Sequence, residues 1–416
     1  MPMDRRGFLA AAAGAAPAIV VGSAPADAIT TVLTGADVLA AQRWRPLAGR
    51  RLGVLTNPTG VLRDLTHIVD DLAAAGVRPL AVFGPEHGFR GTAQAGGSTG
   101  DYTDPRTGIP VYDAYNVTVD KLAGMYRKSG IDTVVFDIAG AGARFYTYTW
   151  TMYLAMRAAV QTGTAFVVLD RPNPIGGQAF GPQLDPAFAT FVGLKPIVQQ
   201  PGMTAGELAR MFDELFLPAD SGGQRLSSLD VVPVRGWRRD TLFAETGLPW
   251  VLPSPNMPTP DTALLYPGTG MFEGTLLSEG RGTTRPFELI GAPTIDWRWA
   301  EALNAAGLPG VRFRENYDVP TFSKFVNQTC GGVQVHLTDR HAVDPIRTAV
   351  TMIVTAKRLY PSVFGWRPDN YIDNLTGSAR LRTMVDAGAS ASDVVDAWHD
   401  ELTAFRQQRR PFLMYR

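Results

Sequence analysis

The stretch RPLAVFGPEHGFRG, residues 78–91, joins an apolar run to two adjacent ionisable side chains. The run PLAVF is the kind of continuous apolar segment that forms a strand buried on both faces of a parallel sheet. Gly and Pro follow it, which places Glu86 and His87 on a turn after the strand. In open α/β sheets, ligands bind outside the carboxyl ends of the strands. The stretch therefore predicts an α/β fold and makes Glu86 a candidate catalytic carboxylate.

Three further apolar runs share this character, and amphipathic stretches alternate with them. They are RLGVLTN (51–57), DTVVFDI (132–138) and AFVVLDR (165–171). Alternation of this kind predicts parallel strands that are covered by helices on both faces. The strands end at Asn57, Glu86, Asp137 and Asp170, and we expect these four polar side chains to line one crevice.

The second half of the chain has a different pattern. Residues 246–293 are rich in Pro, Gly, Thr and Ser but also hold large apolar side chains, which indicates an ordered coil crossing between domains. Beyond it, residues 331–339 predict a strand, and residues 344–361 and 391–410 predict amphipathic helices. We predict a parallel-sheet domain over residues 29–257 and a smaller α/β domain over residues 258–416.

Composition limits the size of the domains, the partners that charge could attract and the disulfides that could form. The chain has 416 residues, 45% of them hydrophobic, which is enough for one large or two ordinary domains. Its 39 basic and 39 acidic residues balance, so no net charge favours binding to nucleic acid. Cys330 is the single cysteine, which rules out an intrachain disulfide.

The first 28 residues, MPMDRRGFLAAAAGAAPAIVVGSAPADA, predict an export signal. Arg5 and Arg6 precede a short Ala-rich apolar stretch, and the small-residue sequence ADA at 26–28 is typical of a cleavage site. The arginine pair favours the twin-arginine route and a periplasmic or extracellular protein. A membrane anchor is the alternative, but the apolar stretch is short for a span. We expect no stable membrane association after cleavage, since no later run approaches about 18 apolar residues.

The opening motif suggests acid–base chemistry. Glu86 can act as a general acid where an apolar neighbour such as Phe83 or Phe89 raises its pKa. His87 is a possible base, and Arg90 a possible substrate ligand. With five histidines and no H-x-x-x-H pair in the chain, we expect no metal site.

Two other motifs resemble known signatures in part of their sequence but lack the context that those signatures require. The sequence GAGARF (140–145) follows a strand, but Phe145 replaces the third glycine of a dinucleotide-binding turn and no acidic residue follows at the required distance. We therefore expect no nucleotide cofactor. The sequence GGSTG (96–100) lies in a polar loop rather than between a strand and a helix, which argues against a serine esterase.

The segment SEGRGTTRPFE (278–288) concentrates Glu279, Arg281, Arg285 and Glu288 in a coil. These side chains can form a salt-bridge network that holds the coil in place. They can also clamp sugar hydroxyls, an amide or a carboxylate, because Arg presents fixed forked donors. The two roles are compatible.

Polar side chains among rigid prolines suit recognition of a hydroxyl-rich ligand. Asp170 and Asn173 in LDRPNPIGG (169–177), and Asn256 in SPNMPTPDTA (254–263), fit this description. The alternative is turn chemistry, since Asn and Asp often bond their own backbone.

These motifs recur together in one known family. In chain order they are LTNPTG, FGPEHGFRG, GARFYTYTWTM, LDRPNPIGG, GMTAGELA, TGLPWVLPSPNMPT, ALLYPGT, SEGRGTTRPFELIGAP, GGVQVHLTD, YIDNLTGS and RRPFLMY. In this order they resemble the exo-β-N-acetylmuramidase family, formerly a domain of unknown function. The resemblance extends from about residue 35 to residue 416.

The resemblance implies a Rossmann-like N-terminal domain, a smaller α/β C-terminal domain and an active site in the cleft between them. It implies a glycosidase of peptidoglycan turnover that removes terminal N-acetylmuramic acid from the non-reducing end of glycan fragments, without metal or nucleotide. On that pattern Glu86 is the leading catalytic carboxylate, and we assign it as general acid. Asp137 or Glu279 would be the partner, as base, nucleophile or orienter of the acetamido group.

The resemblance and the motifs together give a set of candidate substrate ligands, in which an arginine suits the lactyl carboxylate. The set comprises Asn57, His87, Arg90, Arg144, Tyr146, Asp170, Asn173, Asn256, Arg281, Arg285 and Glu288.

The chain departs from the family pattern at three places. Residues 137–142 read DIAGAG where family members commonly read DIQDVG, Phe180 replaces a glutamate, and Leu276 replaces an asparagine. We expect each change to remove a polar side chain from the cleft. The alternative function is therefore a non-catalytic or altered-specificity glycan-binding protein of the cell wall.

Overall fold

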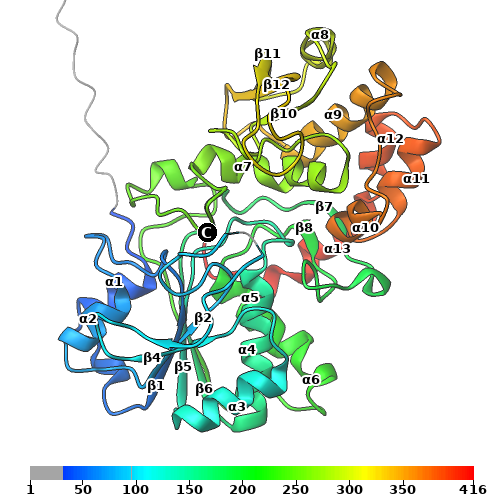
Figure 1. Cartoon of the computed structure of the whole chain (residues 1–416). Helices are drawn as coiled ribbons and strands as arrows, with labels where there is room; N and C mark the ends of the chain where they lie inside the picture. Colours follow the sequence, from blue (N-terminus) through cyan, green and yellow to red (C-terminus); the bar gives the residue numbers. More distant parts are fainter. Residues whose placement is uncertain (1–30, 95) are drawn as a thin grey trace, which may run out of the picture. The chain divides into compact units, whose positions relative to one another are not determined.

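The four apolar runs form the centre of a seven-stranded sheet in the order β3-β4-β2-β1-β5-β6-β9 (Figure 1). The strands are β1 (Leu52–Thr56), β2 (Ala81–Gly84), β3 (Tyr102–Thr103), β4 (Pro110–Asp113), β5 (Thr133–Asp137), β6 (Ala165–Leu169) and β9 (Leu229–Val232). Every neighbouring pair is parallel except β3 with β4. The computed structural model describes residues 31–94 and 96–416, so the predicted export signal lies outside the described residues.

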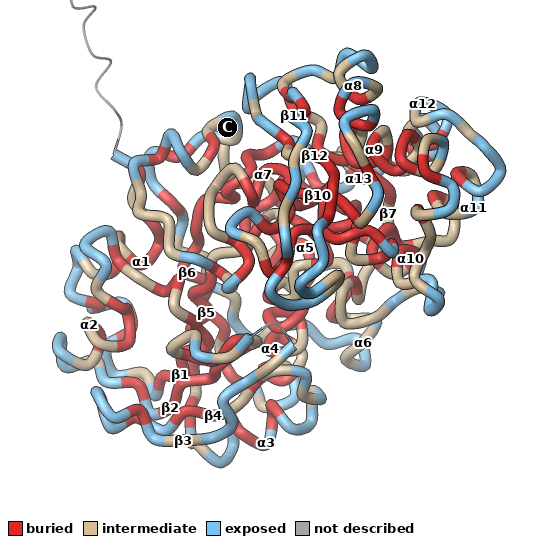
Figure 2. Tube along the Cα trace, turned by 45° about the horizontal axis from the view of Figure 1, so that its top comes forward, coloured by how far each residue is buried: buried red, intermediate tan, exposed pale blue. Residues whose placement is uncertain are grey.

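Helices cover both faces of this sheet, which explains why its central strands are apolar throughout. Successive residues of a strand point to opposite faces, and here Val54 packs with the α1 and α2 side while Leu55 packs with the α3, α4 and α5 side. Figure 2 shows the central strands buried along their length. The helices are α1 (Gly35–Ala40), α2 (Ile68–Ala74), α3 (Val119–Ser129), α4 (Tyr148–Thr162), α5 (Ala205–Leu215) and α6 (Leu217–Asp220). The predicted α/β fold class is confirmed.

A second core surrounds a three-stranded antiparallel sheet in the order β10-β12-β11. Its strands are β10 (Leu289–Ala292), β11 (Val311–Asp318) and β12 (Cys330–Leu337). The helices of this part are α7 (Pro260–Thr269), α8 (Arg298–Ala305), α9 (Pro345–Leu359), α10 (Tyr371–Thr376), α11 (Arg380–Asp386), α12 (Ala391–Asp396) and α13 (His399–Gln408). A separate two-stranded sheet pairs β7 (Phe180–Gln183) with β8 (Val198–Gln200).

Two sequence predictions about local structure were wrong. The segment 246–293, expected to be coil, contains α7 and a 3₁₀ turn, Gly270–Gly274. Thr259 caps α7 and Pro260 is its first residue, both ordinary signals of a helix start that the surrounding prolines obscured. The helix expected over residues 391–410 is two helices, because Trp398 leaves the helical conformation and buries its ring in the C-terminal core.

Arg144 joins the two halves of the fold through a buried side chain. Its guanidinium donates to the carbonyl oxygens of Pro182 (3.1 Å), Ile197 (3.2 Å) and Leu375 (2.6 Å). The first two acceptors belong to the segment around β7 and β8, and the third lies in α10. One side chain thus fixes the loop before α4 against a helix more than 200 residues away.

The end of the chain returns to the parallel sheet. The Tyr415 hydroxyl donates to Asp170 at 2.5 Å, and the Met414 amide donates to Glu207 at 2.7 Å. Asp170 stands at the end of β6 and also accepts from Thr204 and from the Gly206 amide. The C-terminus therefore completes the hydrogen bonding of a carboxylate in the first half of the fold. Within residues 31–94 and 96–416, no helix has the length and apolarity needed to cross a bilayer.

His67 is buried and holds the start of α2 against the end of β1. Its Nδ1 accepts from the Val69 amide at 3.2 Å, and its Nε2 lies 3.0 Å from the Asn57 carbonyl oxygen. An Nδ1 that accepts must be unprotonated, so the ring is neutral with its proton on Nε2. Burial lowers the pKa of His67 to about 4.

This histidine should make the protein less stable in mild acid. Because His67 binds fewer protons in the folded state than in the unfolded state, the neutral ring contributes to the unfolding free energy. This contribution is complete above about pH 6.5 and is lost as the pH falls toward about 4. The full loss is about 3 kcal/mol of unfolding free energy. Urea unfolding of wild type and His67→Gln at several pH values measures it. The unfolding free energy of the variant should change less between pH 6.5 and 4 than that of wild type. An equal change in both proteins would contradict a neutral, buried His67.

Candidate active site

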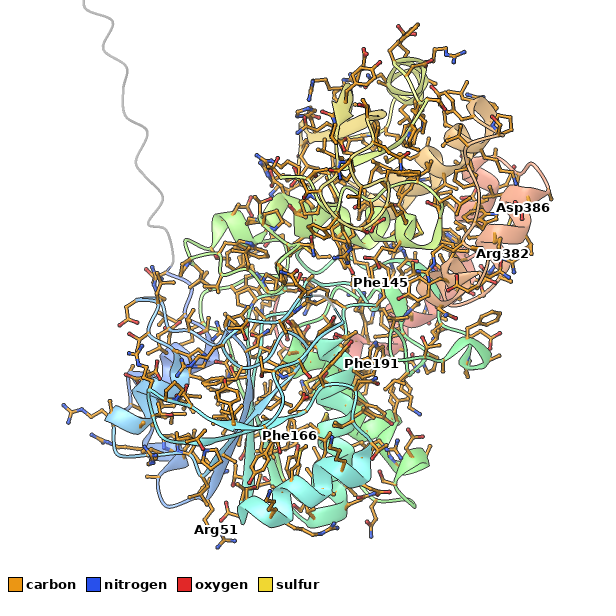
Figure 3. The ribbon with its side chains drawn as sticks, in the orientation of Figure 1. Arg51, Phe145, Phe166, Phe191, Arg382 and Asp386 are labelled. Carbon is orange, nitrogen blue, oxygen red and sulfur yellow. The ribbon has the colours of Figure 1, made fainter. Side chains whose placement is uncertain are left out.

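A cleft of about 660 Å³ is lined by residues from both halves of the fold. The parallel-sheet half contributes the loop after β2 and the loop before α4, including Phe145, which Figure 3 labels together with the cleft residue Phe191. The second half contributes the segment after α7, the β11–β12 loop and the start of α10. The cleft thus combines segments that are far apart in the sequence.

Glu86 lies in this cleft, directly after β2, and two donors fix its carboxylate. Oε1 accepts from the Gly96 amide at 2.8 Å, and Oε2 accepts from the Thr147 hydroxyl at 2.7 Å. Thr147 is the N-cap residue of α4, yet its side chain makes no capping hydrogen bond. Its hydroxyl donates to Glu86 instead, so the loop before α4 orients the carboxylate.

The other two ionisable residues of the opening motif have different positions. His87 lines the cleft with φ of 70°, and its Nδ1 lies 3.1 Å from the Ala93 carbonyl oxygen. Arg90 does not line the cleft. Its Nη2 pairs with Asp70 and Asp104, each at 2.9 Å. The structure therefore gives Arg90 a role in holding the loop and does not support it as a substrate ligand.

Opposite charges alternate along the side of the cleft formed by the second half. Arg281 pairs with Glu273 at 2.5 Å and approaches Glu279 at 3.4 Å. Glu279 also pairs with Lys324 at 2.8 Å. The remaining donors of Lys324 serve the carbonyl oxygens of Phe272 and Leu277. Both expected roles of this segment are compatible with the geometry, since an ion-pair network presents Glu279 and Arg281 to the cleft.

Glu273 is a cleft carboxylate that sequence reasoning missed. Burial raises its pKa, the nearby Glu279 adds to the shift, and Arg281 opposes it. It occupies the sequence GMFEG between two motifs used for the family resemblance. A buried carboxyl beside a second carboxylate is a frequent feature of acid–base sites.

Arg285 and Glu288 belong to the same segment but do not line the cleft. They pair with each other at 3.2 Å, and Glu288 also accepts from the Thr262 hydroxyl at 2.5 Å. These contacts attach the coil to α7. The expectation that either residue contacts substrate is not supported by their positions.

Aromatic rings form another wall of the cleft. Tyr146 makes edge contacts with Tyr148 and Tyr266, at centroid distances of 5.2 and 5.8 Å, and Phe287 packs on Tyr266 at 4.7 Å. The Tyr146 hydroxyl is buried at the cleft wall near Ser254, and burial raises its pKa. Tyr146 therefore lines the cleft, and its contact with substrate stays a prediction.

The expectation that four strand ends line one crevice was wrong for three of them. Glu86 lines the cleft, whereas Asn57, Asp137 and Asp170 are fully buried and do not. Asp137 forms a forked ion pair with Arg171, at 2.5 and 2.8 Å. Asn57 accepts from Thr59 through its side chain. The two carboxylates that end buried strands are thus paired with protein groups from other segments, and the Asn57 side-chain oxygen accepts from the loop that follows it.

Three other candidates are also placed away from the cleft. Arg144 is fully buried in the contacts described above. Asn173 bonds Met203 and Ile175 backbone groups, as the turn interpretation of its motif predicts. Asn256 is buried and does not line the cleft. Arg144 and Asn173 instead line a second cavity in the described part of the chain. A contact of any of the three with substrate stays a prediction.

Several cleft residues were not assigned a role from the sequence. Lys324 lies in the β11–β12 loop, and Arg367 and Tyr371 lie around the start of α10. Tyr371 begins the family motif YIDNLTGS, but that motif indicates no chemistry by itself, and only tertiary packing brings the three residues to the cleft. Among residues 31–94 and 96–416, no cluster of His, Cys, Asp and Glu side chains has the arrangement of a metal site.

Comparison with known proteins shows to which family the chain belongs. The model "Exo-beta-N-acetylmuramidase NamZ, N-terminal" matches residues 52–261, and the corresponding C-terminal model matches residues 264–415. The chain belongs to the exo-β-N-acetylmuramidase NamZ family. It is 44% identical over 388 residues to the peptidoglycan beta-N-acetylmuramidase NamZ of Bacillus subtilis (strain 168), covering 92% of this chain and 91% of the relative.

Two crystal structures of DUF1343 family proteins from Bacteroides fragilis NCTC 9343 are similar to the NamZ-family fold described here. The first, at 1.65 Å resolution, is 33% identical with a TM-score of 0.84 and covers 93% of this chain and 100% of its own. The second, at 1.30 Å, is 29% identical with a TM-score of 0.74 and covers 93% and 99%. The predicted family is confirmed. The predicted domain boundary at residues 257 and 258 stays a prediction.

The three departures from the NamZ-family pattern lie at positions whose present side chains do not line the cleft. Ala139 and Gly140 are not among its lining residues, and neither are Phe180 in β7 and Leu276. Phe180 packs against Arg406, and Leu276 is exposed beside Gly365. The effect of these changes on the polarity of the cleft stays a prediction.

The Thr147 contact gives a direct test of how Glu86 is held. Thr147→Val keeps the shape but removes the hydrogen bond to Oε2, so kcat/KM on an N-acetylmuramide should fall roughly tenfold or more. Steady-state kinetics measures the loss, and Thr147→Ser should restore most of the activity. Thr383→Val, an exposed change in α11, is the control. Unchanged kinetics in Thr147→Val would show that this hydroxyl does not support Glu86.

Proposed function

We propose that this cleft hydrolyses the bond after a terminal N-acetylmuramic acid at the non-reducing end of peptidoglycan fragments, with Glu86 as general acid. Membership of the NamZ family makes the chain a glycosidase. The activity of the B. subtilis relative, a peptidoglycan beta-N-acetylmuramidase, supports peptidoglycan as the substrate class. The observation that carries the residue assignment is the position of Glu86: it is held by two donors at the carboxyl end of β2, inside the cleft.

The two oxygens of Glu86 are not equivalent for proton transfer. Oε1 faces the Gly96 amide, which can only donate, so a proton on that oxygen would lose the hydrogen bond. Oε2 faces the Thr147 hydroxyl, which can donate to a carboxylate and accept from a carboxylic acid. Oε2 is therefore the oxygen suited to carry the proton to the leaving glycosidic oxygen and to recover it afterwards.

The second role in glycoside hydrolysis falls to the opposite side of the cleft. Of the two predicted partners, Asp137 is paired with Arg171 outside the cleft, and Glu279 lines it. The position of Glu279 therefore supports it over Asp137 as general base, nucleophile or orienter of the acetamido group. Its ion pairs with Lys324 and Arg281 hold the carboxylate in a fixed position at the cleft wall.

A leaving-group comparison tests Glu86 as the acid. Glu86→Gln should lose roughly 10²- to 10⁴-fold in kcat on a muramic-acid-terminated disaccharide, whose sugar leaving group needs a proton. On 4-nitrophenyl N-acetylmuramide the loss should be smaller, because nitrophenolate leaves without one. Release of N-acetylmuramic acid and of nitrophenol measures the two rates.

Glu301→Gln, an exposed change in α8, is the matched control and should behave as wild type. Undiminished turnover by Glu86→Gln, or equal losses on both substrates, would overturn the assignment of the acid. Binding of fragments by wild type without release of any sugar would instead favour the glycan-binding alternative.

We further propose that the chain is exported by the twin-arginine route and acts in the periplasm or outside the cell, on peptidoglycan-derived glycans rather than on nucleic acid. Arg5, Arg6 and the ADA sequence at 26–28 support it.

Replacing Arg5 and Arg6 by Lys should retain the full-length chain in the cytoplasm, as cell fractionation and immunoblotting would detect. Export of that variant at the wild-type level would contradict the route.

A further inference from the structure

The charged side chains of the cleft differ in how far their hydrogen bonds are already used. Three cations other than histidine line it: Arg281, Lys324 and Arg367. The first two belong to the ion-pair network of the second half. Only a cation with donors to spare can take on an anionic group of the substrate without breaking existing contacts.

Lys324 is committed to the wall of the cleft. Its ammonium donates to the Phe272 carbonyl (3.0 Å) and the Leu277 carbonyl (2.8 Å), and it forms an ion pair with Glu279 at 2.8 Å. Its side chain holds the β11–β12 loop to the cleft wall. Withdrawing it for a ligand would leave buried acceptors unpaired, which is costly.

Arg281 is also committed. It pairs with Glu273 and Glu279, and its guanidinium carbon lies 5.0 Å from the centroid of the Phe287 ring. Two carboxylates already neutralise its charge. An additional anion would meet the negative charges of Glu273 and Glu279 at close range.

Arg367 differs in the position and number of its carboxylate partners. Its one side-chain hydrogen bond within the described residues runs from Nη2 to Asp369 at 2.6 Å, and Nε and Nη1 have no partner there. Asp369 is exposed and does not line the cleft. The guanidinium lies over the Tyr371 ring, 4.6 Å from its centroid, so stacking fixes its plane while N–H donors stay open at its edge.

The backbone around Arg367 fixes its place in the cleft. The Arg367 amide donates to the Gly274 carbonyl at 3.0 Å, one residue after Glu273. Tyr371, on which the guanidinium stacks, also lines the cleft, as do Glu273 and Glu86. Arg367 thus belongs to the wall that the second half of the fold contributes to the cleft of Glu86.

We infer that Arg367 binds the lactyl carboxylate of the terminal N-acetylmuramic acid and is the residue by which the cleft distinguishes this sugar from N-acetylglucosamine. The inference rests on the proposed function, since it names a contact of that same site. N-acetylglucosamine has the same ring and acetamido group but lacks the lactyl group, so an arginine that serves the carboxylate contributes to one sugar alone. None of Arg90, Arg285 and Arg144, which the sequence suggested for substrate binding, lines the cleft.

Binding of the two free sugars provides the test, because it requires no turnover. Dissociation constants of N-acetylmuramic acid and N-acetylglucosamine would be measured by NMR titration of the full mature chain. Wild type should prefer the acidic sugar. In Arg367→Met that preference should fall roughly tenfold to a hundredfold, the contribution of a charged hydrogen bond, while binding of N-acetylglucosamine stays nearly unchanged. Arg367→Lys should retain part of the preference, since it keeps the charge and loses the fork.

Arg340→Met is the control, because Arg340 pairs with Asp261 at a similar exposure outside the cleft. It removes the same charge and should keep the wild-type preference. The inference is overturned if wild type does not discriminate between the sugars, if Arg367→Met keeps the wild-type ratio, or if it weakens both sugars equally. Failure of the proposed function would appear elsewhere, as absence of sugar release by a wild type that still shows the binding preference.

Discussion

The buried guanidinium of Arg144 is the contact on which the geometry of the cleft depends. It ties the loop before α4 to the carbonyl oxygens of Pro182 and Leu375. That loop carries Tyr146 and Thr147 into the cleft, and α10, which holds Leu375, carries Tyr371. A charge without a carboxylate partner is expensive to bury, and three carbonyl acceptors are what make it tolerable. Any shift of one half against the other would break those bonds, so the two walls of the site are held in register.

The parallel sheet and its edge could be derived from the sequence because they follow from short-range regularities. Continuous apolar runs over five residues mean a strand covered on both faces, and the structure has β1, β2, β5 and β6 where those runs lie. The position of Glu86 follows from the same logic, since a turn after a buried strand exposes its side chains at the ligand edge. Composition and spacing were sufficient for these conclusions.

The same logic failed for the neighbouring strand ends, and the failure has a physical cause. A buried polar side chain at the end of a strand needs a hydrogen-bond partner, and the sequence does not say whether a ligand or another segment of the chain supplies it. Asp137 is taken by the forked donors of Arg171, and Asp170 by Thr204 and Gly206 at the start of α5. Arg367 could not be predicted as a ligand for the converse reason. Its segment has no recognisable sequence pattern, and only the structure shows that its contacts with Asp369 and Tyr371 leave N–H donors without a partner.

The return of the C-terminus to the parallel sheet has a consequence for how the chain matures. Asp170 ends a strand in the first half, yet one of its acceptor sites is filled by Tyr415, the penultimate residue. Met414 likewise supplies the amide for Glu207. During synthesis, the polar centre beside β6 cannot be completed until Met414 and Tyr415 have left the ribosome. The N-terminal half is therefore not a module that finishes folding on its own, because residues more than 200 positions later supply two of its hydrogen bonds.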